Sequence, residues 1–175
     1  MRRVNVIGGS GSGKTSVGRA IAATLGLPFI ELDEIHWSRY PNWRMPATDE
    51  FRIWVDEATS GDGWVVDGSY GRVRDIIWSR ADTVVWLDPP FLMRFGRVLR
   101  RTLGRMRTGE PLWGIQRETF RAAFFSRDSL LLFMIRTERR RGRVYREWLA
   151  RPEYRHLEVV HLRSAAEIAA WLARI

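Results

Sequence analysis

Short apolar runs alternate along the chain with amphipathic stretches. Five apolar runs have the length of buried strands, at 3–7, 28–32, 64–66, 83–87 and 157–162. Stretches with helical spacing separate them, the clearest at 13–25, 48–58, 91–107 and over much of 115–150. The capping sequence at 164–167 opens a last helix that runs through 172. Short apolar strands that alternate with helices predict an α/β fold, a parallel sheet with helices on both faces.

No internal repeat or linker divides the pattern, so we expect a single domain over residues 1–175. The longest apolar run, 130–135, is far below the roughly 20 residues that cross a membrane. The first residues lack the pattern of a signal peptide, and the chain contains no cysteine, which fits a reducing compartment. We therefore expect a cytoplasmic protein without a membrane partner, and the oligomeric state stays open.

The positive charge is concentrated in one part of the chain. The net charge is +9, yet residues 94–143 hold 14 arginines and 4 acidic residues, and the remainder is nearly neutral. Such a block binds nucleic acid, holds a phosphorylated small molecule, or is a solvated surface. The run at 139–141 favours a solvated helix end.

Residues 8–15 read GGSGSGKT and match the P-loop pattern G-x-x-x-x-G-K-[ST] between a predicted strand and a predicted helix. Backbone N–H groups of such a loop surround phosphates, the lysine reaches the β- and γ-phosphates, and the hydroxyl after it binds Mg²⁺. The pattern predicts ATP and Mg²⁺ as cofactors. The predicted nucleotide-binding residues are Gly8, Gly11, Ser12, Gly13, Lys14, Thr15 and Ser16.

Lys14 is the only lysine among the 29 basic residues. Elsewhere arginine supplies charge equally well, whereas a P-loop needs a compact point charge that arginine's planar fork does not offer. This placement supports a catalytic role for Lys14.

Three acidic residues follow predicted strands, where ligands bind in open parallel sheets: Asp33, Asp67 and Asp88. We interpret Asp67 as the acid that organises Mg²⁺ together with Thr15, through water. Asp33 is the candidate for binding the acceptor or taking a proton from its hydroxyl group. Asp88 precedes two prolines and is interpreted as a turn residue. A capping role is the alternative for each.

On the predicted helix at 91–107, Arg94, Arg97, Arg101 and Arg105 form a narrow stripe beside an apolar face. We expect the apolar face to pack on the sheet and the stripe to face a cleft.

These motifs together resemble the adenylate kinase and shikimate kinase-like group of P-loop kinases. The segments LDEIHW (32–37), PNW (41–43), WVVDGSY (64–70) and ADTVVWLD (81–88) are similar to a bacterial adenylate kinase-related family, also labelled "DNA topology modulation protein". The resemblance implies a five-stranded sheet in the order 2-3-1-4-5, an acceptor-binding segment at about 41–63 and an arginine-rich helical lid at about 97–140. It also implies that Arg97 and Arg101 act in catalysis, one stacking on the base and one contacting the phosphates.

The sequence departs from adenylate kinases after Asp67-Gly68, where Ser69-Tyr70-Gly71-Arg72 replaces Phe-Pro-Arg. This puts AMP as acceptor in doubt, although Arg72 is placed to take the arginine's role. The predicted acceptor-binding residues are Asp33, His36, Trp37, Trp43 and Arg72, and a core position is the alternative for the aromatic ones.

The predicted function is Mg-ATP-dependent phosphotransfer to a small acceptor: a nucleoside, a nucleotide or a hydroxylated metabolite. The alternative is a nucleic-acid-associated NTPase or regulator that uses the basic stretch on a phosphate backbone.

Overall fold

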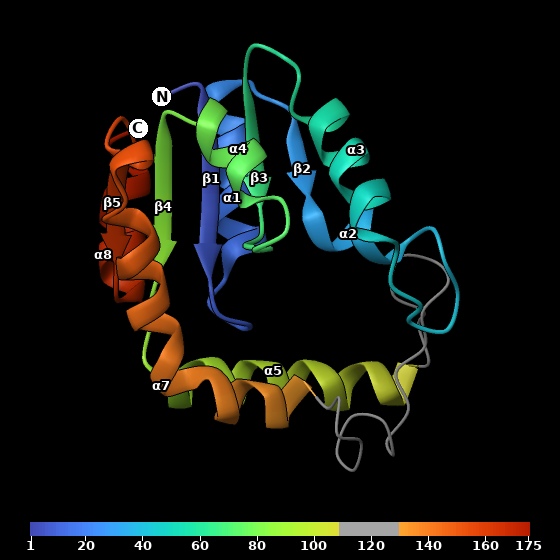
Figure 1. Ribbon diagram of the computed structural model, residues 1–175. Coiled ribbons are helices and arrows are strands. Elements are labelled where there is room, and N and C mark those ends of the chain that lie inside the picture. The colour runs from blue at the N-terminus through green and yellow to red at the C-terminus, as the bar shows by residue number, and fades with distance from the viewer. Residues whose placement is uncertain (109–129) are drawn as a thin grey trace.

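The computed structural model describes residues 1–108 and 130–175, and a five-stranded parallel sheet forms its centre (Figure 1). The strand order is β2-β3-β1-β4-β5, and every neighbouring pair is parallel. The predicted fold class and strand order are therefore confirmed. The strands are β1 (Arg3–Gly8), β2 (Phe29–Glu31), β3 (Trp64–Asp67), β4 (Thr83–Leu87) and β5 (Glu158–Leu162).

Helices connect the strands and cover the sheet. Glycines in the left-handed region flank α1, Gly13 with φ 94° and Gly26 with φ 65°, where a residue with a Cβ would be strained. Before α8, the Ser164 hydroxyl accepts a hydrogen bond from the Glu167 N–H, as the capping sequence predicts. The helices are α1 (Lys14–Leu25), α2 (Leu32–Trp37), α3 (Thr48–Ala58), α4 (Arg74–Arg80), α5 (Phe91–Thr108), α7 (Leu130–Leu149), the 3₁₀ turn η1 (Pro152–Tyr154) and α8 (Ala165–Leu172).

Alternate strand residues supply two separate cores, one on each face of the sheet. Val66, Val84 and Trp86 pack in one core with residues of α3, α4 and the C-terminal half of α7. Val65 and Val85 pack in the other with α1 and α8. Because helices cover both faces, side chains of the loops gather at the carboxyl ends of β1, β2 and β3. We call this end of the sheet its open edge.

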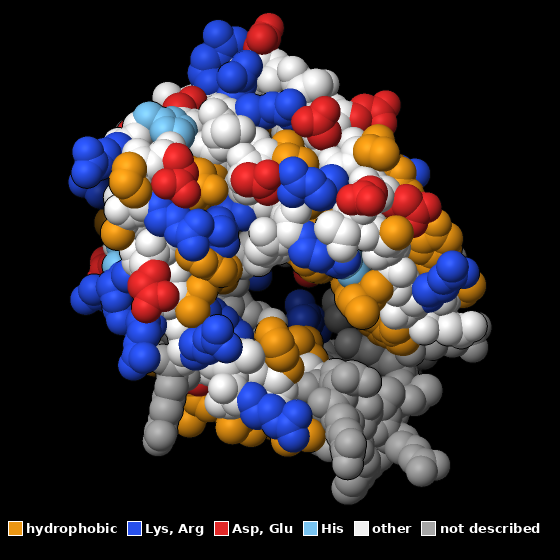
Figure 2. Space-filling model, in the orientation of Figure 1, with side chains coloured by type: hydrophobic (Ala, Val, Ile, Leu, Met, Phe, Trp, Pro, Cys, Tyr) orange, Lys and Arg blue, Asp and Glu red, His pale blue; other side chains and the backbone are white. Residues whose placement is uncertain are grey.

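Helix α5 packs against α7 rather than on the sheet, which corrects the sequence-based expectation. Val98, Leu131 and Met134 form a third cluster, to which Phe95 and Leu99 add partly buried contacts, while Leu103 is 41% exposed. An apolar stripe shows that a helix has a partner, and here the partner is a second amphipathic helix. Figure 1 shows α5 and α7 side by side across the open edge of the sheet, and Figure 2 shows the hollow between them and the strands.

Two further elements differ from the sequence interpretation. The run at 28–32 contributes only three residues to β2, and Leu32 already begins α2. Helix α4 occupies seven residues for which no element was predicted. Residues 115–129 of the predicted helical stretch at 115–150, part of the predicted lid and the side chain of Arg105 lie outside the described residues. Within the described ranges, no helix combines the length and apolar character needed to cross a bilayer.

Candidate functional site

The loop between β1 and α1 closes on itself around Gly9. The Gly9 carbonyl accepts a hydrogen bond from the Ser12 N–H at 3.1 Å, and the Lys14 Nζ lies 3.5 Å from the same oxygen. Gly11 has φ 74°, and a Cβ there would collide with the Arg94 carbonyl. The loop thus has the tight turns and the lysine position that a phosphate cradle requires.

The other predicted nucleotide-binding residues occupy the same turn and its flanks. Gly8 ends β1, and Gly13 immediately precedes α1. The Ser12 side chain is buried, and its Oγ has no hydrogen-bond partner among the described residues. Ser16 is exposed in the first turn of α1.

Thr15, in the first turn of α1, meets Asp67 at the carboxyl end of β3. The Thr15 hydroxyl donates a 2.5 Å hydrogen bond to Oδ2 of Asp67. Asp67 is only 4% exposed, and its Oδ1 is buried without a partner in the part of the chain that the structure describes. The parallel register places Asp67 beside Val6 of β1, so the carboxylate lies directly next to the P-loop.

This pair fits a magnesium ion. Burial raises the pKa of the Asp67 carboxyl above its ordinary value, the Lys14 charge and the Thr15 hydrogen bond lower it, and the Asp33 charge raises it again. A divalent cation would favour the ionised carboxylate that burial disfavours. Mg²⁺ prefers oxygen ligands and keeps several waters, so the unpartnered Oδ1 is a suitable acceptor for a metal-bound water.

Asp33 lies in the first turn of α2 and is bound by a tyrosine that the sequence interpretation did not include. The Tyr70 hydroxyl donates a 2.6 Å hydrogen bond to Oδ1 of Asp33. Burial, with the Asp33 charge, raises the pKa of Tyr70, so Tyr70 stays protonated and acts as a donor. Oδ2 of Asp33 has no such partner among the described residues, which leaves it available to a ligand's hydroxyl group.

His36 is buried beneath Arg72, so its ring is not an exposed wall of an acceptor pocket. The Arg72 Nη2 lies 2.5 Å from the His36 Nε2, and arginine can only donate, so Nε2 is the acceptor and the ring proton is on Nδ1. Burial, together with the Arg72 charge, lowers the pKa of His36 to about 4. The Arg72 guanidinium also lies over the Phe51 ring and 3.4 Å from the Thr48 hydroxyl.

The predicted tryptophans are neighbours on the rim of this cluster. The rings of Trp37 and Trp43 are edge to face, with centroids 5.5 Å apart. Trp43 is 37% exposed and has a positive φ of 56°. Contacts through His36 and Tyr70 connect them with Asp33 and Arg72 in one cluster next to α2.

The arginines behave differently from the predicted stripe. Arg97 and Arg101 are both exposed; the Arg97 Nη1 is 3.5 Å from the Gly11 carbonyl, and Arg101 lies one turn further along α5. Arg94, from the same stripe, is 2% exposed and lies against Gly9. Arg141 lies there too, and its side chain is only 14% exposed, so the expectation of a solvated helix end is wrong for this residue. Pairing with α5 and the P-loop buries it.

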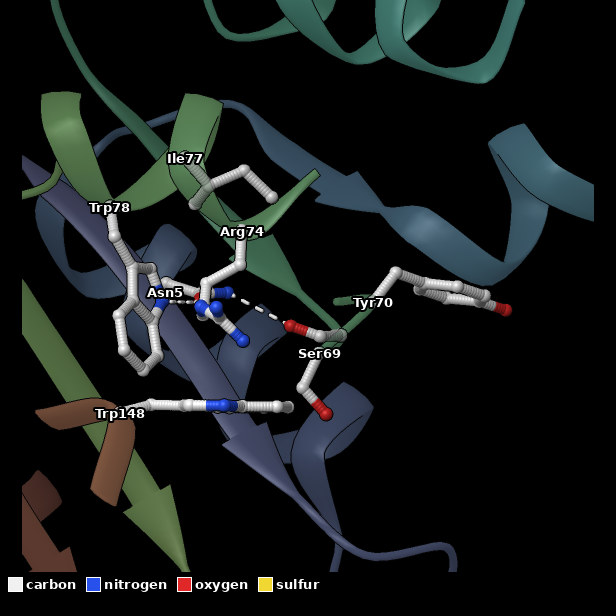
Figure 3. Close-up of a pocket in the computed structure, with 8 residues that line it drawn as sticks. Asn5, Ser69, Tyr70, Arg74, Ile77, Trp78 and Trp148 are labelled. Carbon is white, nitrogen blue, oxygen red and sulfur yellow. Dashed lines mark hydrogen bonds between the residues drawn. The ribbon is translucent and has the colours of Figure 1, made fainter. Parts of the chain in front are cut away.

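A small cavity of about 10 Å³ lies behind the loop that follows β3 (Figure 3). The Asn5 amide donates to the Gly68 carbonyl and its oxygen accepts from the Trp78 indole. Figure 3 shows Tyr70 pointing away from this cavity and the Arg74 guanidinium above Trp148, 3.8 Å from the ring centroid. The cavity has room for about one water. Its residues therefore fix the loop that carries Tyr70 rather than bind a substrate.

Comparison with known proteins places this geometry in a class. The fold and the P-loop site define a nucleotide-binding α/β protein of the P-loop kinase type. The family model for shikimate kinase matches residues 10–47, which include all but the first two residues of the P-loop, and α1, β2 and α2. A search among curated proteins finds no significant match.

Three solved structures illustrate the likeness in fold. Shikimate kinase from Acinetobacter baumannii, in complex with shikimate, is 16% identical with a TM-score of 0.64, covering 99% of this chain and 90% of its own. A gluconokinase from Sinorhizobium meliloti is 25% identical with a TM-score of 0.51, covering 99% and 92%. A sugar kinase from Janibacter is 24% identical with a TM-score of 0.54, covering 99% and 93%.

The shikimate kinase family match and the gluconokinase structure support an ATP-dependent small-molecule kinase, as the sequence predicts. The other two structures show that this chain has the fold of P-loop kinases. None of the matches described above is to a DNA topology modulation protein, so that closer resemblance stays a prediction.

Proposed function

We propose that the protein transfers the γ-phosphoryl group of Mg-ATP to a hydroxyl group of a small, anionic acceptor. The observation that carries this proposal is the Asp33 carboxylate, held by Tyr70 at the same sheet edge as the Thr15–Asp67 pair. A carboxylate in that place suits an acceptor hydroxyl that must be oriented toward the terminal phosphate.

In the reaction, the acceptor oxygen forms a bond to the γ-phosphorus as the bond from that phosphorus to the β,γ-bridging oxygen breaks. The acceptor's hydroxyl proton passes to Asp33, and ADP leaves with the bridging oxygen. Mg²⁺, when bound, neutralises charge on the phosphates. Thr15 and Asp67 would hold it, and Lys14 would contact the β- and γ-phosphates.

Arg72 supports an anionic acceptor. Its guanidinium has five N–H donors, of which His36 and Thr48 take two. The remaining donors suit a carboxylate or phosphate on the acceptor. The matched shikimate kinase structure contains shikimate, and the other matches are described as a gluconokinase and a sugar kinase. We therefore favour a hydroxy acid over AMP, whose adenylate kinase motif Phe-Pro-Arg is missing here.

The test is ATP consumption in the presence of Mg²⁺ with three sets of acceptors: hydroxy acids such as shikimate and gluconate, nucleosides and their monophosphates, and short DNA or RNA. We expect a rate increase with one hydroxy acid that is lost in Lys14→Ala and Asp33→Asn. Asp49→Asn, an exposed carboxylate on α3, is the matched control for Asp33.

A different result would overturn the proposal. Tight ATP binding that no small acceptor converts to turnover, with salt-dependent binding of DNA or RNA, would favour the nucleic-acid-associated alternative. The burial of Arg94 and Arg141 speaks against that alternative, because these two cations of the basic stretch lie at the P-loop.

A further inference from the structure

Two arginines from different helices converge on Gly9 of the P-loop. Arg94 comes from α5 and Arg141 from α7. A Cβ at Gly9 would collide with the Nη1 atoms of both guanidiniums. Both Nη1 atoms are buried, and neither has a hydrogen-bond partner within the described residues. Two like charges with unsatisfied donors therefore lie together over the phosphate-binding loop.

Hydrogen bonds hold Nε and Nη2 of Arg94 and Nη2 of Arg141. Arg94 donates from Nη2 to Glu138 at 2.5 and 2.6 Å, and from Nε to the Pro89 carbonyl at 3.0 Å. Arg141 donates from Nη2 to the Thr137 hydroxyl at 2.8 Å, and its Nη1 is 3.9 Å from Glu138. These contacts hold both side chains with their Nη1 atoms against Gly9 of the loop.

Among the described residues, Glu138 is the only carboxylate in ion-pair contact with these two cations. Burial and the Arg94 charge lower the pKa of Arg141 more than the charges of Tyr145, Glu138 and Asp88 raise it. Leaving a buried donor unsatisfied is unfavourable, and more so when the donor is charged. An anion between the two Nη1 atoms would remove both costs and restore charge balance.

Lys14 identifies which anion belongs there. Its Nζ approaches Gly9 from the carbonyl side, 3.5 Å from that oxygen. Three cations thus surround Gly9, and a P-loop lysine reaches the β- and γ-phosphates. The P-loop pattern accepts any residue at position 9. The two arginines, and not the motif, therefore explain why this residue is glycine.

We infer that Arg94 and Arg141 contact the γ-phosphoryl group of ATP, that Glu138 is the positioning residue for Arg94, and that Gly9 leaves the space the two guanidiniums need. The inference rests on the proposed function and deepens it. It replaces Arg101 with Arg94 and Arg141 as the cations nearest the transferred group.

The test compares binding of ADP with binding of an ATP analogue whose β,γ-bridge cannot be cleaved, by calorimetry with Mg²⁺. The wild-type protein is expected to prefer the triphosphate. Arg94→Met and Arg141→Met should reduce that preference by about tenfold and change ADP affinity by less than about twofold. Arg143→Met, an exposed arginine on α7, and Arg100→Met, an exposed arginine on α5, are the matched controls.

Two further variants protect the test against misfolding. Gly9→Ala leaves every charge in place and only pushes the guanidiniums away, and it should lower the preference similarly. Glu138→Gln keeps the side-chain shape and should lower the preference less than Arg94→Met, while ADP affinity stays constant. A misfolded variant would lose ADP binding, which identifies it.

The inference is overturned if Arg141→Met and Gly9→Ala keep the wild-type preference, or if they lose ADP binding and triphosphate binding equally while folded. Failure of the proposed function gives another pattern: the wild-type protein would phosphorylate no acceptor, yet these variants would still lose the triphosphate preference.

Discussion

The two sides of the candidate site are built in different ways. On the phosphate side, the backbone turn around Gly9, the helix that follows it and nearby cations act on a ligand part that all nucleoside triphosphates share. On the acceptor side, side chains bind one another between α2 and the loop after β3, as in the pairs Tyr70–Asp33 and Arg72–His36. Backbone contacts recognise a common group, whereas side-chain pairs can differ with each acceptor. We therefore expect the proposed acceptor side to determine specificity.

The largest expected effect lies on the phosphate side. Lys14→Arg keeps the charge but replaces a compact ammonium with a planar fork that does not fit beside the Gly9 carbonyl. We expect kcat/KM to fall about 10³-fold, with weaker ATP binding. Turnover and calorimetry measure this, with Arg100→Lys as the control for the opposite exchange. Activity within about threefold of wild type would show that position 14 needs only positive charge.

Asp33→Asn should separate the two sides. Loss of the proton acceptor is expected to lower kcat about 10²-fold or more, with the Kd for ATP changed by less than about twofold. Steady-state rates give kcat and a binding measurement gives the Kd for ATP. Asp49→Asn should leave both quantities unchanged. If ATP affinity fell along with kcat, the two sides would not be energetically separate.

His36 should make the free energy of unfolding depend on pH. Its pKa is lowered from 6.5 to about 4, so between these values the unfolded chain holds a proton that the folded protein lacks. The free energy of unfolding should therefore fall as the pH drops from 6.5 toward 4, by about 3 kcal/mol at most. Urea unfolding at several pH values tests this. His36→Asn should flatten the slope over this range, and an equal slope in both proteins would contradict it.

The smallest effect concerns the support of the loop after β3. The Tyr145 and Ser69 hydroxyls lie 2.7 Å apart, and Tyr145→Phe removes one partner. We expect a loss of about 1 kcal/mol in the free energy of unfolding, with a modest rise in the acceptor KM. Tyr154→Phe, another buried tyrosine in the same core, is the control. An unchanged acceptor KM would show that Ser69 does not help to hold the acceptor side.

The phosphate side was largely predictable from sequence because its residues are consecutive. The prediction for Gly8 to Ser16 depended only on a strand before the motif and a helix after it, and both are present. Asp67 followed from its place at the end of a valine-rich strand. The acceptor residues Asp33 and Arg72 were proposed from the ends of strands and from a resemblance, and the structure brings them to one cluster around His36.

Contacts between distant segments account for what the sequence did not reveal. Arg94 was on the predicted stripe, but its partner Glu138 is 44 residues away. The run containing Arg141 has the composition of a solvated helix end, and only the P-loop and α5 bury it. Tyr70 follows Asp67 closely, yet its bond to Asp33 depends on how α2 and β3 lie together. Helix α2 was missed because its first residue, Leu32, also continues the apolar run of β2.

Helix α7 belongs to two cores at once, which gives it a mechanical role. Met134 packs in the cluster with α5, and Tyr145 packs in the core on the sheet. Tyr145 lies 11 positions after Met134, about 16 Å along the helix, a distance that an intact helix does not stretch. Glu138 and Arg141 lie between the anchors. Helix α7 therefore links α5 rigidly to the core on the sheet. Any displacement of α5 relative to the strands must tilt α7 and disturb its packing at both ends.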